Sequence, residues 1–286
     1  MRMKKTAQIN RSTGGNIFIG LFLAIFASLM LIPLIYAVSS SIKPFHELWV
    51  FPPRFFVKNP TMKNYKDILS LMTSSWVPFS RYIFNTLFIA VAGTAGHVFL
   101  ASMCAYVLSK CNIIGGKVIF KLIVLSLMFS TAVTAIPNYL IISKLGLMDN
   151  YGAIILPAFA SSLGLYLMKQ FIDSMIPNTI LEAAKVDGAN HFKMYADIVM
   201  PMVKPAWLTL IVFSFQALWN TGGGIYIRSE KLKTLNYAIG QIVSAGIARA
   251  GAGAAAIVLM MLLPIIVFVA TQSRVVETMA TSGIKE

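Results

Sequence analysis

The residues of this chain that could carry out chemistry are arranged in an unusual way. All ten Asp and Glu side chains fall outside six long apolar runs, and His97 is the ionisable group inside one of them. Carriers driven by protons or sodium ions commonly place an ionisable group inside a helix bundle, although this costs about 2.5–3.5 kcal/mol or more at the membrane centre. His97 stands among Gly93, Gly96 and Ala101, so it could serve in such coupling or in a hydrogen bond between helices. The lack of carboxylates in the runs argues against a carrier of this kind.

Two glycine-rich segments imitate nucleotide-binding motifs without meeting their requirements. Residues 115–117 read Gly-Gly-Lys but are followed by Val118, where a phosphate-binding loop needs Ser or Thr. Residues 251–256 imitate a dinucleotide fingerprint, yet they open an apolar run, so close helix packing explains them. Cys104 and Cys111 have neither the spacing of a zinc site nor that of a disulfide framework. We therefore expect no catalytic residue, no cofactor-binding residue and no metal site.

Side-chain amides are the remaining polar groups in or near the apolar runs that could meet a solute. They are Asn85, Asn138, Gln216 and Asn220. Their donors and acceptors could bind the hydroxyl groups of a sugar along a translocation pathway, or they could bond to neighbouring helices.

The apolar runs are the elements that must position these groups. About 30 Å of hydrocarbon at 1.5 Å per residue requires roughly 20 apolar residues. Six runs qualify, the fifth only when the approach from Pro201 is included: residues 17–38, 82–109, 122–142, 151–168, 206–219 and 250–271. The chain is 57% hydrophobic and 12% charged, too few charges for a polar surface over a domain of this size. The sequence predicts an all-α membrane protein with six transmembrane helices.

The excess of basic residues bears on partners and on orientation. The formal net charge is +14, from 24 Lys and Arg against 10 Asp and Glu. The basic residues lie between apolar runs, where they can meet anionic lipid headgroups, so we expect a lipid bilayer and no nucleic acid as the partner. An even number of spans places both termini on one side. The basic residues divide almost evenly between the two sides of the membrane, and the N-terminal tail, with four basic and no acidic residues, weakly favours the cytoplasm.

These patterns divide the chain into four parts. We expect a cytoplasmic N-terminal tail in residues 1–15, and a first transmembrane helix with a proline-rich external cap in residues 16–80. A membrane core follows in residues 81–275, with a cytoplasmic loop at about 172–203, and residues 276–286 form a cytoplasmic C-terminal tail.

The loop between the fourth and fifth runs has the pattern of a helix, a sharp turn and a second helix. Pro177 favours a helix start, and Gly188 favours a left-handed stop after Asp187. A low-relief apolar face is formed by Ile180, Leu181, Ala184 and, less centrally, Ala183, with Glu182 beside it. Such a face suits docking on a soluble partner, although an ordinary solvated loop gives the same pattern.

Residues 182–189, Glu-Ala-Ala-Lys-Val-Asp-Gly-Ala, together with Phe192, Ile198, Pro201 and Pro205, resemble the EAA loop of ABC-importer inner-membrane permeases. Residues 144–147, 151–157 and 168–171 resemble the maltose-type carbohydrate permeases, and residues 281–286 resemble a divergent form of their C-terminus. Trp219–Asn220 fits the family pattern, whereas residues 221–224 depart from it.

This resemblance implies a type I ABC-importer permease fold whose loop is a coupling helix seated on an ATPase. The implied coupling residues are Glu182, Ala183, Ala184, Asp187, Gly188 and Ala189. In this interpretation Glu182 meets a basic residue of the ATPase, Ala183 and Ala184 pack in its groove, and Gly188 holds the turn. The resemblance also places the loop and both termini in the cytoplasm.

The resemblance further implies a division of labour. The chain would form half of a translocation pathway for a sugar or oligosaccharide in a bacterial cytoplasmic membrane, paired with a second, homologous permease. Two ATP-binding subunits would hold ATP and Mg, an extracytoplasmic sugar-binding protein would deliver the solute, and the chain itself would not be an enzyme. The alternatives from other classes are a stand-alone secondary carrier or channel, and a membrane scaffold or assembly factor.

Overall fold

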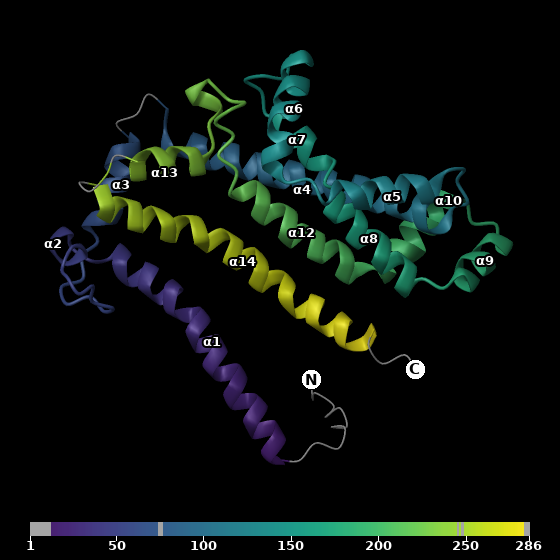
Figure 1. Ribbon diagram of the computed structural model, residues 1–286, viewed down its shortest axis with the longest axis horizontal. Helices are drawn as coiled ribbons and strands as arrows, with labels where there is room; N and C mark the ends of the chain where they lie inside the picture. The colour runs from purple at the N-terminus through teal and green to yellow at the C-terminus, as the bar shows by residue number, and fades with distance from the viewer. Residues whose placement is uncertain (1–12, 74–76, 245, 247–248, 283–286) are drawn as a thin grey trace. The chain divides into compact units, whose positions relative to one another are not determined.

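The computed structural model describes residues 13–73, 77–244, 246 and 249–282, and all regular secondary structure in these residues is helical (Figure 1). Four described segments are long and apolar enough to cross a membrane: Gly14–Ser41, Phe79–Lys110, Gly152–Met175 and Ala250–Gln272. They belong to helix α1 (Thr13–Ser41), helix α4 (Phe79–Lys110), helices α7 (Gly152–Phe159) and α8 (Ser162–Met175), and helix α14 (Ala250–Ser282). The count rises to six if each of two bent pairs is one span.

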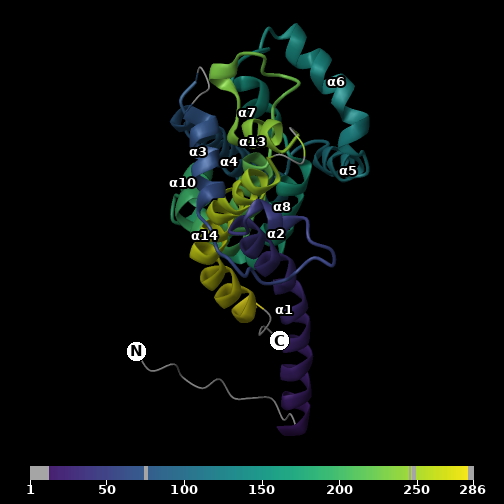
Figure 2. The ribbon, with the colours of Figure 1, turned by 90° about the vertical axis from the view of Figure 1, so that its left-hand side faces the viewer.

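The two bent pairs correct the expectation of continuous helices over residues 122–142 and 201–219. The chain bends by 112° between helix α5 (Gly116–Ser126) and helix α6 (Thr131–Lys144). Figure 2 shows the two helices running in different directions. Between them Ser130 is extended and caps α6, its carbonyl accepting from the backbone N–H of Val133 at 3.1 Å. A count of apolar residues does not register such a bend.

The second bend, of 79°, separates the segment His191–Met202 from helix α12 (Lys204–Trp219). Pro205 has no N–H to donate and its ring conflicts with the carbonyl four residues earlier, at Pro201, so a straight helix cannot continue. Val203, at the bend, is fully buried.

The chain packs as two compact units, and the first contains residues 13–68 and the start of α14. It includes α1, the short helix α2 (Phe45–Leu48) and the start of helix α3 (Lys63–Thr73). In the cap, the Glu47 carboxylate accepts from the backbone N–H groups of Lys58 at 3.0 Å and Asn59 at 3.1 Å. These hydrogen bonds hold the pKa of Glu47 below its usual value. The cap is therefore ordered by its own polar contacts.

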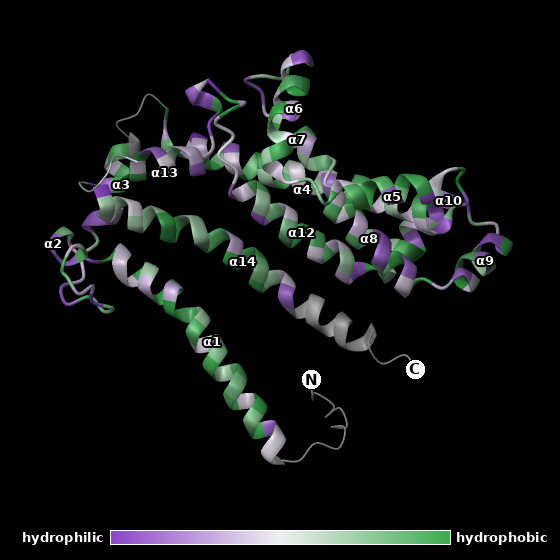
Figure 3. Ribbon diagram, in the orientation of Figure 1, coloured by the Kyte–Doolittle hydropathy of each residue, from purple (hydrophilic) through white to green (hydrophobic). Residues whose placement is uncertain are grey.

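Helix α1 has the surface of a lipid-facing span. It is hydrophobic along most of its length (Figure 3), and Phe18 and Met30 are 70% and 73% exposed. A span bordered by lipid needs no polar face. The expected N-terminal tail, residues 1–15, lies largely outside the described residues, as do residues 283–286 of the expected C-terminal tail, whose earlier part continues α14 to Ser282.

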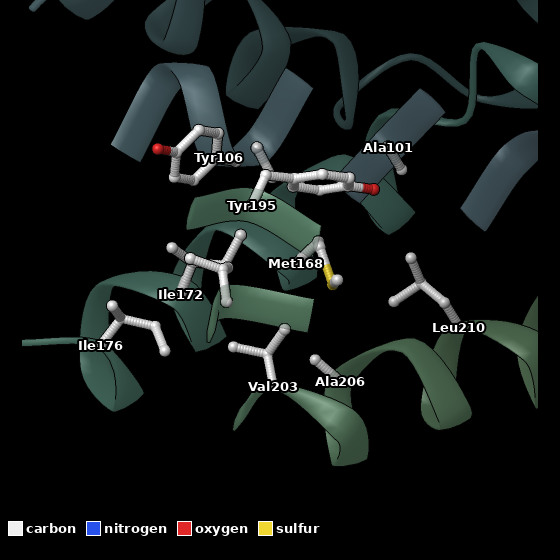
Figure 4. Packing of buried hydrophobic residues seen from close by; sticks show 11 residues of the cluster. Ala101, Tyr106, Met168, Ile172, Ile176, Tyr195, Val203, Ala206 and Leu210 are labelled. Carbon is white, nitrogen blue, oxygen red and sulfur yellow. The ribbon is translucent and has the colours of Figure 1, made fainter. Parts of the chain in front are cut away.

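The second unit is built around α4, α8 and α12, which lie side by side (Figure 1). Their shared core is a cluster of buried apolar residues (Figure 4): Ala101, Ala105, Tyr106, Met168, Ile172, Ile176, Tyr195, Val199, Val203, Ala206 and Leu210. In the same unit the Trp219 indole donates to the Met260 carbonyl at 2.8 Å, which joins α12 to α14. Helix α4 is the longest element of this core, and both functional regions described below contact it.

Candidate functional site

The segment between α8 and α12, residues 176–203, forms a helix, a turn and a second helix, as expected; we call it the elbow. Its first helix is α9 (Asn178–Val186), preceded by Pro177 in an extended conformation. Ile176, just before it, is 1% exposed and belongs to the core cluster. The start of the elbow is thus anchored in the interior, while α9 extends outward (Figure 1).

Gly188 ends α9 in the way that the sequence predicts. Its φ is +80°, a left-handed conformation that an L side chain adopts at a cost of roughly 1–2 kcal/mol. The N–H of Ala189 donates to the Ala184 carbonyl at 2.9 Å, and the N–H of Gly188 donates to the Lys185 carbonyl at 3.1 Å. This pair of bonds is a Schellman motif, which satisfies the last carbonyls of α9 and fixes the direction of the turn.

The second half of the elbow starts with a capped helix and contains a π-turn. Asn190 accepts from the Lys193 N–H at 2.8 Å, capping α10 (His191–Lys193), which continues as the π-helical turn η1 (Met194–Val199) and α11 (Met200–Met202). Pro201 cannot donate to the carbonyl four residues before it, at Asp197. The wider turn accommodates this missing bond, and such turns are frequent at functional sites.

The residues expected to form one apolar face of the elbow lie on two sides of α9, one facing the core and one facing outward. Leu181 packs against the core cluster and Ala184 is half-buried, whereas Ala183 turns outward with Glu182. Of the predicted coupling residues, Glu182, Ala183, Asp187 and Gly188 are exposed, while Ala184 and Ala189 are half-buried.

Two exposed apolar side chains on the elbow received no surface role from the sequence: Val186, and Phe192, which was named only as part of the EAA-loop resemblance. Val186 is 89% exposed and Phe192 is 67% exposed. The signal was available, because both stand in a polar loop where an apolar residue has no core to enter. Val186 stands four residues after Glu182 and three after Ala183 on α9, so these three exposed side chains share one side of the helix. They combine charge with apolar area, and we call them the outer face of the elbow.

Of the four amides proposed for a pathway, Gln216 and Asn220 are one helical turn apart, and the Asn220 side chain donates to the Gln216 carbonyl at 2.9 Å. Asn85 is fully buried, donates to the carbonyls of Lys231 and Lys233 at 2.9 Å each, and accepts from the Tyr151 hydroxyl at 2.7 Å. This arrangement favours the structural alternative for Asn85. The other three amides, Asn138, Gln216 and Asn220, are exposed.

A cavity of about 380 Å³ lies among α4, α7, α8 and α12. Its wall is mainly apolar, with polar groups from His97, Ser161, Ser214, Thr221 and Tyr226, and it includes none of the four amides. Within the described residues no group of three or more His, Cys, Asp or Glu side chains could hold a metal ion. What the cavity offers is therefore apolar contact with a few hydrogen-bonding groups, a pattern typical of sites for small organic ligands.

His97 has a defined role in this cavity wall. Its Nδ1 lies 3.3 Å from the Phe159 carbonyl, and a Cβ added to Gly164 would lie 2.0 Å from its Nε2. The histidine therefore fills the space left by Gly164 and joins α4 to α7, as the helix–helix interpretation predicts.

At the end of α4 far from the elbow, a loop of residues 221–234 is held by polar contacts. It contains the short helix η2 (Glu230–Leu232) and leads into helix α13 (Leu235–Ser244). Tyr82 donates to the Glu230 carboxylate at 2.8 Å, and Lys233 donates to the same carboxylate at 2.5 Å. Burial alone would raise the pKa of Glu230, but these hydrogen bonds outweigh it and lower the pKa.

Comparison with known proteins places this arrangement in a family. Residues 97–280 match the family described as the binding-protein-dependent transport system inner membrane component. A polygalacturonan/rhamnogalacturonan transport system permease protein of Bacillus subtilis (strain 168) is 31% identical over 210 residues, which cover 70% of this chain and 67% of the relative. An inner membrane ABC transporter permease protein of Escherichia coli (strain K12) is 28% identical over 265 residues, 91% of this chain and 93% of the relative.

A solved structure supports the same assignment. The crystal structure of a bacterial ABC transporter involved in the import of the acidic polysaccharide alginate contains a chain that matches with a TM-score of 0.74 and 25% identity. The match covers 93% of this chain and 99% of that chain. The chain therefore belongs to the family of binding-protein-dependent transport system inner membrane components: it is a multi-pass permease subunit of an ABC importer in the bacterial inner membrane, it works with a binding protein, and it leaves ATP hydrolysis to a partner subunit.

Proposed function

We propose that the elbow is the coupling element of this permease and that its outer face docks on the ATP-hydrolysing subunit. Glu182 supplies a charge for a basic residue of that subunit, and Ala183 and Val186 supply apolar area that enters its groove. The observation that carries this proposal is the exposure of Val186, at 89%, on a helix whose direction is fixed by the Schellman turn at Gly188. Half-buried Ala184 and Ala189 act by holding the turn against the rest of the elbow.

The proposal includes an orientation. The contacts with the 221–234 loop begin at Tyr82, and α4 ends beside the elbow at Lys110, so the two regions are separated by about 42 Å at 1.5 Å per residue. This distance exceeds the roughly 30 Å of membrane hydrocarbon. The elbow and the 221–234 loop therefore lie on opposite sides of the membrane. The EAA-loop resemblance supports a cytoplasmic elbow, an even number of spans supports both termini on that same side, and the 221–234 loop then faces the binding protein.

The complete importer that we propose has this chain as one half of the pathway and a second, homologous permease as the other half. Two ATP-binding subunits, with ATP and Mg²⁺, complete the assembly, and an extracytoplasmic sugar-binding protein delivers the solute. The cavity beside α4 contributes hydroxyl groups and apolar surface, which suit the hydroxyls and the ring faces of a sugar.

The proposed cargo is a sugar or oligosaccharide, and an acidic oligosaccharide is the first to test. Both the Bacillus subtilis relative and the alginate importer carry names that specify acidic polysaccharides. In this chain Arg81, Arg228 and Lys231 are exposed, and Arg81 Nε donates to the Lys231 carbonyl at 3.3 Å, so cations lie around the 221–234 loop. Opposite charge raises the local concentration of an anionic solute. Uptake of galacturonate oligomers should exceed uptake of neutral oligomers of equal length; equal uptake contradicts the acidic class.

The coupling role is tested by Glu182→Arg in the complete importer. We expect the variant to insert into the membrane, to lose the ATP-hydrolysing subunit during purification, and to lose uptake. Lys121→Glu, a charge reversal of the same size on exposed α5, is the matched control and should retain both. Normal subunit association and normal uptake in Glu182→Arg would exclude the outer face as the docking surface.

A further inference from the structure

Three polar side chains of α4 point to one side of the helix and contact three different parts of the elbow. Ser102, Tyr106 and Lys110 are spaced four residues apart, so they share one face. We call them the α4 ladder. Each forms a hydrogen bond to a residue between positions 176 and 195.

Lys110 holds the joint between α8 and α9. Its ammonium donates to the Ile176 carbonyl at 2.7 Å and to the Asn178 side-chain oxygen at 3.0 Å. Ile176 is the C-terminal cap of α8, and Asn178 is the first residue of α9. A cation at this point also meets the negative end of the α8 dipole. One side chain of α4 therefore fixes both the end of one helix and the start of the next.

Tyr106 contacts the second half of the elbow. Its hydroxyl lies 3.3 Å from His191 Nδ1, and its ring centroid lies 5.8 Å from that of Tyr195. Tyr106 is 4% exposed, so the contact combines a hydrogen bond with buried aromatic packing.

Ser102 forms the deepest contact of the ladder. Its hydroxyl lies 2.6 Å from the Tyr195 hydroxyl, and it also donates to the Phe99 carbonyl at 2.9 Å. Because the single proton of Ser102 serves Phe99, Tyr195 must be the donor in the bond between the two hydroxyls. Ser102 is fully buried, so loss of this bond leaves a polar group unpaired in the interior.

The ladder lies against the apolar cluster shown in Figure 4, where Tyr106 of α4 and Tyr195 of the elbow pack together above Ile172 and Val203. Apolar packing resists separation but is not directional. The hydrogen bonds of the ladder add direction, so the elbow cannot rotate or slide on α4 without breaking them. We therefore expect the elbow and the C-terminal half of α4 to move together as a rigid unit.

The opposite end of α4 is bonded in the same manner to the 221–234 loop. Tyr82, Asn85 and Thr86 contact that loop and the residue after it, Leu235, through hydrogen bonds of 2.7–2.9 Å. A helix is stiff along its axis, so a displacement applied at one end is passed to the other, about 42 Å away.

We propose that Ser102, Tyr106 and Lys110 are positioning residues that make α4 the strut between the elbow and the 221–234 loop. The proposal rests on the coupling role of the elbow and assigns the residues through which that role reaches the other face of the membrane. A contiguous network of bonded groups is the physical requirement for such transmission.

The test uses the complete importer in proteoliposomes, with ATP hydrolysis measured with and without the substrate-loaded binding protein. Lys110→Met removes the hydrogen bonds to Ile176 and Asn178, whereas Tyr195→Phe and Ser102→Ala each remove the bond between Ser102 and Tyr195. We expect these variants to assemble with the ATP-hydrolysing subunit and to keep basal hydrolysis, while stimulation by the binding protein falls by at least about fivefold. Lys110→Arg keeps a cationic donor and should keep most of the stimulation.

The matched control is Lys121→Met on α5, which removes the same charge from an exposed side chain that makes none of the described hydrogen bonds or ion pairs with the elbow, and it should be fully stimulated. If Lys110→Met fails to assemble, Tyr195→Phe and Ser102→Ala carry the test, because each removes a single hydroxyl. If the binding protein stimulates ATP hydrolysis fully in these two hydroxyl variants, the proposal that α4 acts as a strut is wrong. Failure of the proposed coupling role of the elbow is recognised by a different result. In that case the Glu182→Arg importer would still assemble and transport, whatever the ladder variants do.

Discussion

Thr86 and Leu235 are joined by a hydrogen bond of 2.7 Å, from the backbone N–H of Leu235 to the Thr86 hydroxyl. Thr86 is fully buried and donates in turn to the Tyr82 carbonyl at 2.9 Å. The first turns of α4 thus satisfy the N–H at the start of α13, where a helix has no internal acceptor. Thr86 of the transmembrane helix α4 therefore holds the start of α13, 149 positions later in the chain.

Thr86→Val should destabilise the protein while Thr86→Ser should not. Valine has the shape of threonine but no hydroxyl, so the buried Leu235 N–H loses its acceptor, at a cost of about 1–3 kcal/mol. Serine keeps the acceptor and loses one methyl group. Thermal unfolding in detergent and amide exchange at the start of α13 measure the difference. Equal stability of the two variants would show that water replaces the hydroxyl.

Two substitutions of Gly188 should distinguish the effect of its backbone conformation on uptake from the effect of side-chain size. A Cβ at this position meets nothing within 4 Å, so the cost arises from the φ of +80°. Gly188→Asn should retain uptake because asparagine tolerates this conformation, whereas the β-branched Gly188→Val should distort the turn and lower uptake severalfold. Initial uptake rates at equal membrane abundance provide the measurement. Equal rates for the Asn and Val variants would mean that the turn geometry is not required.

Gly164→Ala should be destabilising, and His97→Ala should relieve part of the effect. The added methyl group would lie 2.0 Å from His97 Nε2, so α4 and α8 must shift or the imidazole must leave its place beside the Phe159 carbonyl. Overpacking of this kind costs about 1–3 kcal/mol. In the double variant the clash is absent, so the two effects should not add. The melting temperatures of the two single variants and the double variant test this, and simple additivity would argue against the contact.

The features that the sequence predicts correctly are local ones. Helices α1, α4 and α14 follow from uninterrupted apolar length, because the membrane sets a length that the sequence must match. Gly188 follows from the few residues that accept a left-handed conformation. In both cases the determining information lies within the segment itself.

The features that the sequence does not predict depend on distant partners. The bend between α5 and α6 has no proline or glycine at residues 127–130, and Ser126 beside it bonds to Ser162 at 2.6 Å. The amide of Asn85 donates to carbonyls 146 and 148 positions later in the chain. The residue type and its local sequence therefore could not show whether Asn85 lines a pathway or anchors a loop. The hydroxyl groups of the cavity come from several elements, and no spacing within one run reveals them.

The attachment of the 221–234 loop should weaken in acid because of Glu230. Its pKa in the folded protein is lowered below 4.5 by the Lys233 and Tyr82 hydrogen bonds, which outweigh burial. A depressed carboxyl pKa contributes stability that is present above the unfolded value and is lost as the pH falls through the folded value. Burial alone would lower the pKa of Lys233, but the same bond to Glu230 raises it. The stability that charged Lys233 gives to the loop is therefore kept until the pH rises well above neutrality.

Amide exchange in the 221–234 loop therefore should be slow and constant near neutral pH and should accelerate, after correction for the intrinsic rate, only below about pH 4.5. Glu230→Gln keeps the shape but removes the charge, so its loop should exchange faster at neutral pH and show no acid step. Peptides from α9 in the same samples are the internal control, because the elbow makes no contact with Glu230 in the described hydrogen bonds and ion pairs. An acid step of equal size in wild type and Glu230→Gln would assign the loop's attachment to groups other than this carboxylate.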